Sequence, residues 1–292
     1  MRRTCPAPIW TSDHRITYGV WEFSQRAAAL FEAIAIRHRV QFPPESAEDL
    51  PQGEVFFYVL ENGDRIRLRF HDYARIYERP GLYEQLFYDR LKCTSPSKVD
   101  SILRRTVEAN GQDATSLRVL DLGAGNGMMG EVLKRNGVSR LVGIDIVPEA
   151  REACLRDRPG LYDEYYISDF TQLDEEKRAE IDEWRIDCLT SVAALGFGDI
   201  PQRAFAQALD FVKPGGWVAF NIKETFLEPS DSSGFSRMVR AMLFSEAIQV
   251  HHIERYWHRL SMEGNPLTYY AIVLRKMAPL PSHFLEELEA ES

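Results

Sequence analysis

The sequence predicts an α/β protein with a doubly wound, mostly parallel sheet that carries helices on both faces. From about residue 117, short apolar runs alternate with helical segments, which is typical of βαβ units. Two long β-rich runs near the end, 248–262 and 267–276, flank a short turn and predict an antiparallel pair. With 292 residues, the chain suits one large domain with an elaboration.

The part before residue 95 has a different character. Residues 23–40 have helical character, and residues 54–71 read as a β-hairpin around Asn62-Gly63. Residues 74–110 then read as helical pieces rich in tyrosine. We therefore expect an N-terminal helical and hairpin region over residues 1–94.

The following part predicts the parallel sheet in order. Apolar runs that end in turn residues indicate the strands, and segments with helical pattern lie between most of them. The expected strands are 118–123, 140–146, one within 162–170, 186–195 and 217–222; the expected helices are 127–137, 148–158, 200–212 and 235–247.

Charge and cysteine content exclude several classes of function. The formal net charge of −9 is poorly suited to non-specific binding of polyanions, so we expect no nucleic-acid partner. The four cysteines are far apart and form no CxxC pair, which favours reduced thiols in the cytoplasm and no metal site. No run of about 18 apolar residues occurs, so we expect no membrane span. The sequence leaves open whether the protein forms a homodimer.

The turn after the first parallel strand carries three alternate glycines, Gly123, Gly125 and Gly127, with Asp121 just before them. Ligands of open α/β sheets bind at such turns. The dinucleotide pattern would need a glycine at Met128, and an acid beside the loop would repel a pyrophosphate but suit a cationic ligand. A tight turn that merely needs small residues is the alternative.

Acids follow the next two strands as well. Asp145 lies 20 residues beyond Gly125, where a carboxylate can accept hydrogen bonds from both ribose hydroxyls. Asp169 and Phe170 follow the third strand and can bind the amino group and the face of an adenine. Phe170 could equally be a core residue.

At this point the sequence resembles the class I S-adenosylmethionine-dependent methyltransferases. The resemblance rests on "VLDLGAGNG", "VGIDI", "ISDF", "DCLTSVAAL" and "FVKPGGWVAFNI", in that order. It implies a Rossmann-like, seven-stranded sheet with an antiparallel last strand over residues 95–278, followed by a tail over 279–292. It also implies S-adenosyl-L-methionine as cofactor.

The resemblance further implies a role for each matching residue. Gly123, Ala124, Gly125 and Gly127 would approach the methionine part of the cofactor, and Asp121 its amino group. Asp145 would hold the ribose, Ile146, Asp169 and Phe170 would surround the adenine, and Ser191 would lie near the cofactor and the acceptor. Tyrosines of the segment before the first motif often close over the cofactor in this family, and among Tyr77, Tyr83 and Tyr88 we favour Tyr83.

Catalytic residues are harder to predict, because methyl transfer depends mainly on positioning and needs a base only for a protonated acceptor. His252, His258 and Glu224 are the candidates, while we expect Asp199 to cap the following helix. The predicted function is methyl transfer to an oxygen or nitrogen of a small organic acceptor. A protein-directed methyltransferase, an inactive cofactor-binding module and an NAD-dependent oxidoreductase are the alternatives.

Overall fold

The structure is a computed structural model that describes residues 37–44, 52–195, 199–228 and 234–280. All described residues belong to one compact unit, which begins at Arg37. The predicted domain boundaries at residues 94 and 278 stay predictions.

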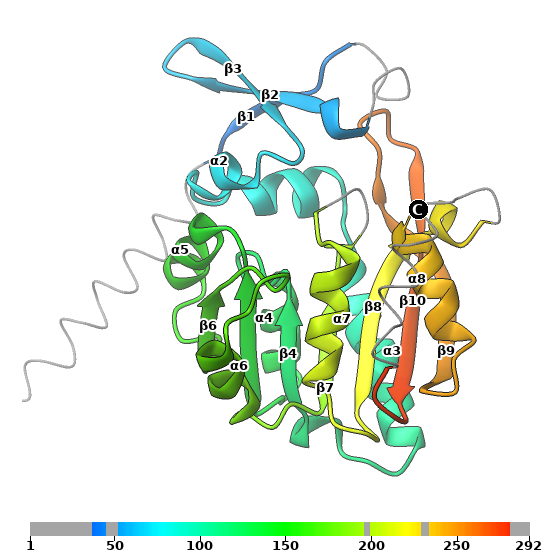
Figure 1. Ribbon diagram of the computed structural model, residues 1–292. Helices are drawn as coiled ribbons and strands as arrows, with labels where there is room; N and C mark the ends of the chain where they lie inside the picture. Colours follow the sequence, from blue (N-terminus) through cyan, green and yellow to red (C-terminus); the bar gives the residue numbers. More distant parts are fainter. Residues whose placement is uncertain (1–36, 45–51, 196–198, 229–233, 281–292) are drawn as a thin grey trace, which may run out of the picture. The chain divides into compact units, whose positions relative to one another are not determined.

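Within the described residues, seven strands form one sheet in the order β6-β5-β4-β7-β8-β10-β9 (Figure 1). Neighbouring strands from β6 to β8 pair in parallel, and β10 pairs antiparallel with both β8 and β9. The Rossmann-like fold with a reversed last strand is therefore confirmed. The bounds are β4 Arg118–Leu122, β5 Arg140–Asp145, β6 Glu164–Ile167, β7 Cys188–Ser191, β8 Trp217–Lys223, β9 Ile248–Leu260 and β10 Pro266–Lys276.

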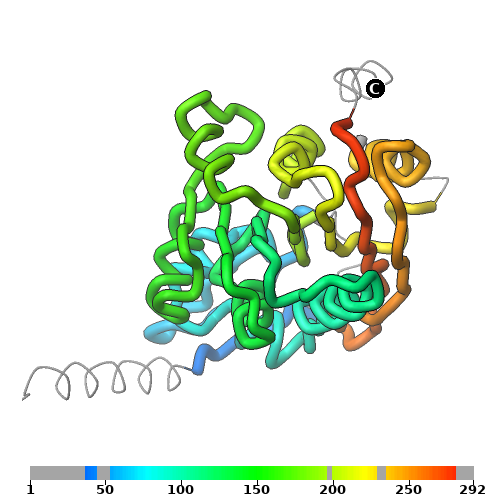
Figure 2. The backbone as a smooth tube through the Cα atoms, turned by 90° about the horizontal axis from the view of Figure 1, so that it is seen from below, coloured from blue at the N-terminus to red at the C-terminus, as the bar shows by residue number. Residues whose placement is uncertain are grey.

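Helices cover both faces of this sheet, as Figure 2 shows for α3 on one side and α7 on the other. The helical bounds are α3 Ser95–Ala109, α4 Met128–Arg135, α5 Pro148–Asp157, α6 Glu175–Asp182, α7 Gln202–Asp210, α8 Gly234–Leu243, and the short η4 Ala114–Ser116 and η5 Glu224–Leu227. Successive residues of a strand point to opposite faces. Trp217 of β8 accordingly joins the core under α3 and α4, and Val218 joins the core under α7 and α8.

The N-terminal part contains a separate three-stranded sheet, β1-β2-β3 (Arg39–Gln41, Phe56–Glu61, Asp64–Arg69). Asn62 and Gly63 both have positive φ, 52° and 92°, which gives the tight turn that their sequence predicts. The hairpin is thus confirmed. The helix expected over 23–40 is wrong at its end, because Arg39 and Val40 pair with β2; its residues before 37 lie outside the described part.

Two short helical segments connect this sheet to α3. They are α2, Tyr73–Tyr77, and the π-helical η3, Glu84–Arg90, while the single turn η2, Gln52–Glu54, precedes the hairpin. Leu82, Leu86 and Leu91 are buried with Phe57 and Leu68 of the hairpin. This small core anchors α2 and η3 above the carboxyl ends of the parallel strands (Figure 1).

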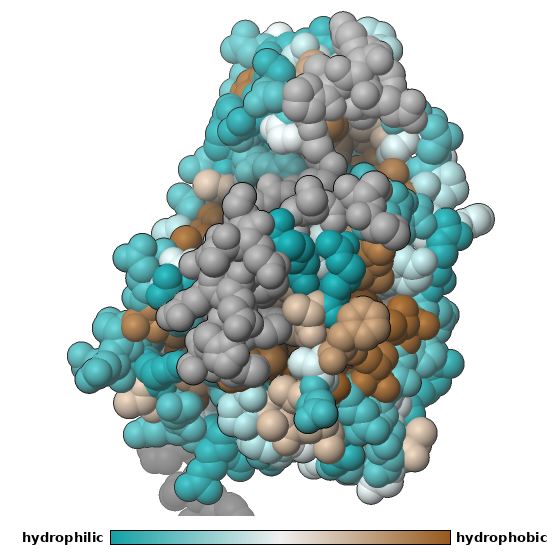
Figure 3. Space-filling model, turned by 45° about the vertical axis from the view of Figure 1, so that its right-hand side comes forward, coloured by the Kyte–Doolittle hydropathy of each residue, from teal (hydrophilic) through white to brown (hydrophobic). Residues whose placement is uncertain are grey.

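The edge strand β9 leaves large apolar side chains in solvent. Trp257 on β9 is 69% exposed, and Phe244, just after α8, is 87% exposed. Figure 3, which turns this side of the molecule forward, shows apolar residues gathered there. Across the described part of the chain, no helix combines the length and hydrophobicity that a bilayer span requires.

Candidate functional site

The glycine turn joins β4 to α4, and each of its three glycines has positive φ: 74° at Gly123, 55° at Gly125 and 91° at Gly127. Such angles favour glycine, but the surroundings of the three differ. A Cβ on Gly125 would lie 2.6 Å from the hydroxyl of Tyr77, whereas one on Gly127 would lie 2.6 Å from Leu161. Gly125 therefore lets a tyrosine approach the turn, and Gly127 lets α4 begin against the core.

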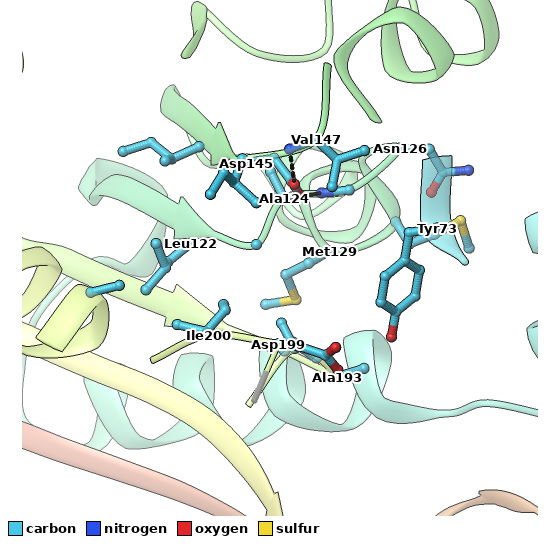
Figure 4. Close-up of a pocket in the computed structure, with 18 of the residues that line it drawn as sticks. Tyr73, Leu122, Ala124, Asn126, Met129, Asp145, Val147, Ala193, Asp199 and Ile200 are labelled. Atoms are coloured by element: carbon cyan, nitrogen blue, oxygen red, sulfur yellow. Dashed lines mark hydrogen bonds between the residues drawn. The ribbon is translucent and has the colours of Figure 1, made fainter. Parts of the chain in front are cut away.

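Asp145 at the tip of β5 holds this turn in place. Its Oδ2 accepts a hydrogen bond from the Gly125 amide (2.8 Å), and its Oδ1 accepts one from the Val147 amide (3.0 Å; dashed lines in Figure 4). Burial raises the pKa of this carboxyl group above its ordinary value. Each oxygen keeps a further lone pair, so the carboxylate can accept two more hydrogen bonds from a ligand.

Asp121 lies beneath the turn and is 1% exposed. Its Oδ1 accepts a hydrogen bond from Thr190 and its Oδ2 one from Tyr162, each at 2.7 Å. Burial, with a smaller contribution from the charge of Asp145, raises the pKa of Asp121 to about 6. The carboxyl group thus ties β4 to β7 and to the residues before β6.

A cavity of about 360 Å³ opens above the carboxyl ends of β4, β5, β6 and β7. Small-molecule sites in proteins have volumes of roughly 300 to 1,000 Å³. Figure 4 shows side chains from several elements around it. Its floor and sides come from residues 122–126, 144–147, 168–170, 192–194 and the start of α7, and its remaining wall from Tyr73, Tyr77, Tyr83, Tyr88 and Pro96.

The tyrosine wall belongs to α2 and η3. The rings of Tyr77 and Tyr83 are 5.1 Å apart, and those of Tyr73 and Tyr77 are stacked at 6.2 Å. Burial raises the pKa of each of these three hydroxyl groups. The wall is therefore neutral and aromatic, and it faces the polar backbone of the glycine turn.

A partly buried ionic network joins the two walls. Arg158 donates to Glu84 of η3 (2.8 Å) and to the backbone oxygen of Asn126 (3.0 Å), and Asn126 also donates to Glu84 (2.7 Å). Asn126 is 2% exposed and lines the cavity. Its Oδ1 accepts no hydrogen bond from the described residues.

A second, smaller cavity of about 70 Å³ adjoins the first. Both are lined by Tyr73, Tyr83, Ala193 and Asp199, and none of Asp145, Ile146, Asp169 and Phe170 reaches the smaller one. Figure 4 shows the ring of Tyr73 pointing toward the end of the larger cavity where Ala193 and Asp199 lie. The smaller cavity therefore extends the larger one at the end away from Asp145.

The profile of the family described as "Methyltransferase domain" matches residues 96–266, which is more than half of the chain. The chain belongs to this methyltransferase family. Together with the fold, this makes it a class I S-adenosylmethionine-dependent methyltransferase by family, and S-adenosylmethionine is its cofactor.

Similar solved structures include methyltransferases with different substrates. A proposed RNA methyltransferase from Pyrococcus horikoshii is 12% identical, with a TM-score of 0.47 over 87% of this chain and 100% of its own. Magnesium protoporphyrin IX methyltransferase from Synechocystis PCC 6803 is 14% identical (TM-score 0.44; 62% and 79%). The N-methyltransferase NodS from Bradyrhizobium japonicum WM9 is 16% identical (TM-score 0.41; 62% and 96%). No curated protein sequence matches the chain significantly.

The cavity of this methyltransferase fits its cofactor. The carboxylate of Asp145 can take the ribose hydroxyls, and the buried, unpartnered Oδ1 of Asn126 suits the cationic amino group at the other end. The predicted cofactor residues that line the cavity are Tyr83, Gly123, Ala124, Gly125, Asp145, Ile146, Asp169 and Phe170. Their individual contacts stay predictions.

Three predicted cofactor residues do not line the cavity of the methyltransferase. Asp121 is buried beneath the turn and accepts a hydrogen bond on each carboxylate oxygen, and Gly127 packs against the core. Ser191 is buried, with its hydroxyl donating to Leu122 (3.0 Å). The structure gives all three a supporting position behind the residues that face the cavity. Direct contact of these groups with the cofactor stays a prediction.

The catalytic candidates lie in different places. His258 is 5% exposed, lines the smaller cavity and is hydrogen-bonded through Nδ1 to Ser95 (2.5 Å). His252 pairs with Glu254 on β9, and Glu224 pairs with Arg255. Neither His252 nor Glu224 lines either cavity.

The expectation that Asp199 caps α7 is wrong, because Pro201 occupies the N-cap position of that helix. Asp199 instead pairs with His71, a residue that the sequence analysis passed over. The sequence also did not identify Tyr73, Asn126 and Met129, which line the larger cavity. The sequence offered one signal, since Asn126 stands within the glycine motif itself.

Proposed function

We propose that this protein transfers the methyl group of S-adenosylmethionine to an oxygen or nitrogen of a small organic acceptor. The observation that carries the proposal is the smaller cavity, which continues the cofactor cavity at the end away from Asp145. Its volume of about 70 Å³ suits a functional group of a few heavy atoms. Titratable side chains line it, as an acceptor that must lose a proton would need.

The residues of the larger cavity divide the work of binding. Asp145 would hold the ribose, and Ile146, Asp169 and Phe170 would surround the adenine. The backbone of Gly123, Ala124 and Gly125 lines the cavity and would contact the methionine part. The tyrosines of α2 and η3 would cover the cofactor and exclude water.

The cofactor supplies a methyl group on a cationic sulfur, which is a good leaving group. The protein's part is to hold the acceptor in line with the methyl–sulfur bond and to keep water out. The neutral aromatic wall suits a cationic sulfonium, because aromatic faces attract cations. Positioning therefore accounts for most of the catalysis that these residues would provide.

Two measurements test the proposal. Calorimetry with S-adenosylhomocysteine should show binding to one site per chain. Transfer of radiolabel from methyl-labelled S-adenosylmethionine should then label the small-molecule fraction of an extract of the source cells, compared with its protein and RNA fractions.

Other results would each contradict a defined part of the proposal. Label in protein would identify a protein-directed methyltransferase, and label in RNA would overturn the expectation of no nucleic-acid partner. Binding without transfer in any fraction would identify an inactive cofactor-binding module. Binding of NADH in place of S-adenosylhomocysteine would identify an oxidoreductase.

A further inference from the structure

We infer that His71, positioned by Asp199, is the general base of this enzyme and that the methyl acceptor is a small molecule with a hydroxyl group. This inference rests on the proposed function and narrows it from oxygen or nitrogen to oxygen. It stands on the hydrogen bond between the two side chains, on their place at the junction of the two cavities and on the charge of Arg259.

The pair joins two distant parts of the chain. His71 follows β3 in the N-terminal part, and Asp199 lies between β7 and α7. Nδ1 of His71 is 3.0 Å from Oδ1 and 3.1 Å from Oδ2 of Asp199, and both side chains are about a quarter exposed. Asp199 lines both cavities and His71 lines the smaller one.

This hydrogen bond assigns the proton of the neutral imidazole. A carboxylate can only accept, so Nδ1 of His71 carries the hydrogen and Nε2 carries the lone pair. No side chain or backbone group of the described residues bonds to Nε2. His71 is therefore held in the tautomer that a base needs, with its basic nitrogen available to an acceptor.

His258 lines the same cavity but is a poorer base. Burial, with a smaller contribution from the charge of Arg259, lowers its pKa well below the ordinary value. Its Nδ1 is bonded to the hydroxyl of Ser95 and not to a carboxylate. An imidazolium on His258 would thus form without a countercharge, whereas one on His71 would lie against Asp199.

Arg259 selects the kind of acceptor. Its guanidinium group lines the smaller cavity, donates to the backbone oxygen of Leu260 (2.9 Å), and forms no ion pair with a carboxylate of the described residues. A positive charge here stabilises the oxyanion that forms as a hydroxyl acceptor loses its proton. Phe70, Phe87 and Tyr269 also line this cavity, and their rings favour a planar, aromatic hydroxyl compound over an aliphatic amine.

The chemical step balances with the groups present. The acceptor oxygen forms the new bond to the methyl carbon, the methyl–sulfur bond breaks, and its electron pair stays on sulfur to give S-adenosylhomocysteine. The hydroxyl proton passes to Nε2 of His71, and the resulting imidazolium is stabilised by Asp199 until it releases the proton to water.

The acceptor's own acidity provides the sharpest test. 4-Methylphenol keeps its proton at pH 8, whereas 4-nitrophenol is largely ionised and needs no base. For His71→Gln, kcat/KM should fall by about 100-fold or more with 4-methylphenol and by no more than about fivefold with 4-nitrophenol. Equal losses with the two phenols would overturn the role of His71, and failure of the wild-type enzyme to methylate either phenol would overturn the hydroxyl acceptor.

A matched control variant is available on β9. His252 also pairs with a carboxylate, Glu254 at 3.0 Å, but lines neither cavity. His252→Gln should change kcat/KM for either phenol by no more than about twofold. A loss as large as that of His71→Gln would contradict the proposal.

The positioning role of Asp199 has a readout that does not depend on turnover. In ¹⁵N-histidine NMR spectra, His71 should be protonated at Nδ1 in the wild type and shift toward the Nε2-protonated form in Asp199→Asn. An unchanged tautomer would overturn the role of Asp199. His71→Gln and Asp199→Asn should bind S-adenosylhomocysteine with an affinity within about twofold of the wild type. This separates the role of the pair from the proposed function, which fails if the wild type does not bind S-adenosylhomocysteine or transfers no label to the small-molecule fraction.

Discussion

The two walls of the larger cavity are built in opposite ways. One wall is backbone, the glycine turn together with the residues after β5. The carboxylate of Asp145 accepts hydrogen bonds from the Gly125 amide of the turn and from the Val147 amide after β5. The other is the aromatic wall of Tyr73, Tyr77 and Tyr83, which comes from a segment at least 40 residues earlier in the chain. The first wall is fixed by local geometry, and the second only by packing.

This difference indicates separate roles for the two walls. A backbone wall offers hydrogen-bonding groups whose positions hardly vary, so it suits recognition of a constant cofactor. An aromatic wall held by the hairpin core and by the network of Arg158 and Glu84 can differ in composition without changing the sheet. It also carries His71 to the smaller cavity, so it suits recognition of the acceptor.

The largest effect should come from filling the backbone wall. Gly125→Val should abolish binding of S-adenosylhomocysteine in calorimetry, because its Cβ would meet Tyr77 and occupy the approach to the turn. Gly160 is the control, since it has a similar φ of 72° and open space around it. Gly160→Val should keep the affinity of the wild type.

A double variant sharpens this prediction. The atom nearest to the added Cβ is the hydroxyl oxygen of Tyr77, and the next is 3.5 Å away. Gly125→Ala combined with Tyr77→Phe should therefore bind more tightly than Gly125→Ala alone. If the second substitution brings no recovery, the two walls do not meet at this point.

Beneath the backbone wall, Asp121 should make stability depend on pH. Its folded pKa of about 6 lies above the ordinary aspartate value of 3.8, so the folded state binds more protons between these values. Stability is therefore lost as pH rises from 4 to 6. Relative to Asp121→Asn, the wild type should lose about 3 kcal/mol of unfolding free energy between pH 4 and 7 in urea titrations.

The control for this pH effect is Asp113. Two hydrogen bonds from Thr115 lower the pKa of this exposed carboxyl group, so any contribution to stability is lost as pH falls. Between pH 4 and 7, the unfolding free energy of the wild type should not decline relative to that of Asp113→Asn. A similar decline in both pairs would show that Asp121 is not the cause.

Removing the charge of Asp145 should weaken cofactor binding without removing the turn. Asp145→Asn should reduce the affinity for S-adenosylhomocysteine by about 1 to 3 kcal/mol in calorimetry, because the ribose hydroxyls lose a charged acceptor. Asp163 accepts a hydrogen bond from Leu141 (2.7 Å) near the opposite end of β5. Asp163→Asn should leave the affinity unchanged, and an equal loss in both variants would contradict the ribose contact.

The smallest effect should come from weakening the ionic network that connects the two walls. Glu84→Gln removes the anion that Arg158 and Asn126 share, and it should lower S-adenosylhomocysteine affinity by about fivefold to tenfold. The comparison variant is Arg135→Gln, which breaks an exposed pair with Glu131 and should change affinity by less than about twofold. An unchanged affinity in Glu84→Gln would mean that the aromatic wall holds its place without this network.

Much of the backbone wall could be predicted from sequence, and much of the aromatic wall could not. Gly123, Gly125 and Asp145 belong to a strand–turn–helix pattern whose geometry is local, so their spacing alone indicates a ligand. The positions of Ser191 and Asp121 were harder to predict, because nothing in the sequence indicates whether a residue at a strand end faces the cavity or the core. The structure directs both downward.

The sequence by itself determined the strands of the large sheet and most of its helices, the reversed last strand, the hairpin turn and the glycine wall, because periodicity, turn chemistry and motif spacing are properties of neighbouring residues. Only the tertiary structure decided which tyrosines cover the cavity and that His71 meets Asp199, 128 residues away. Such pairings depend on how two separately folded elements pack. Packing is set by the summed shape of many side chains and leaves no signal at either residue alone.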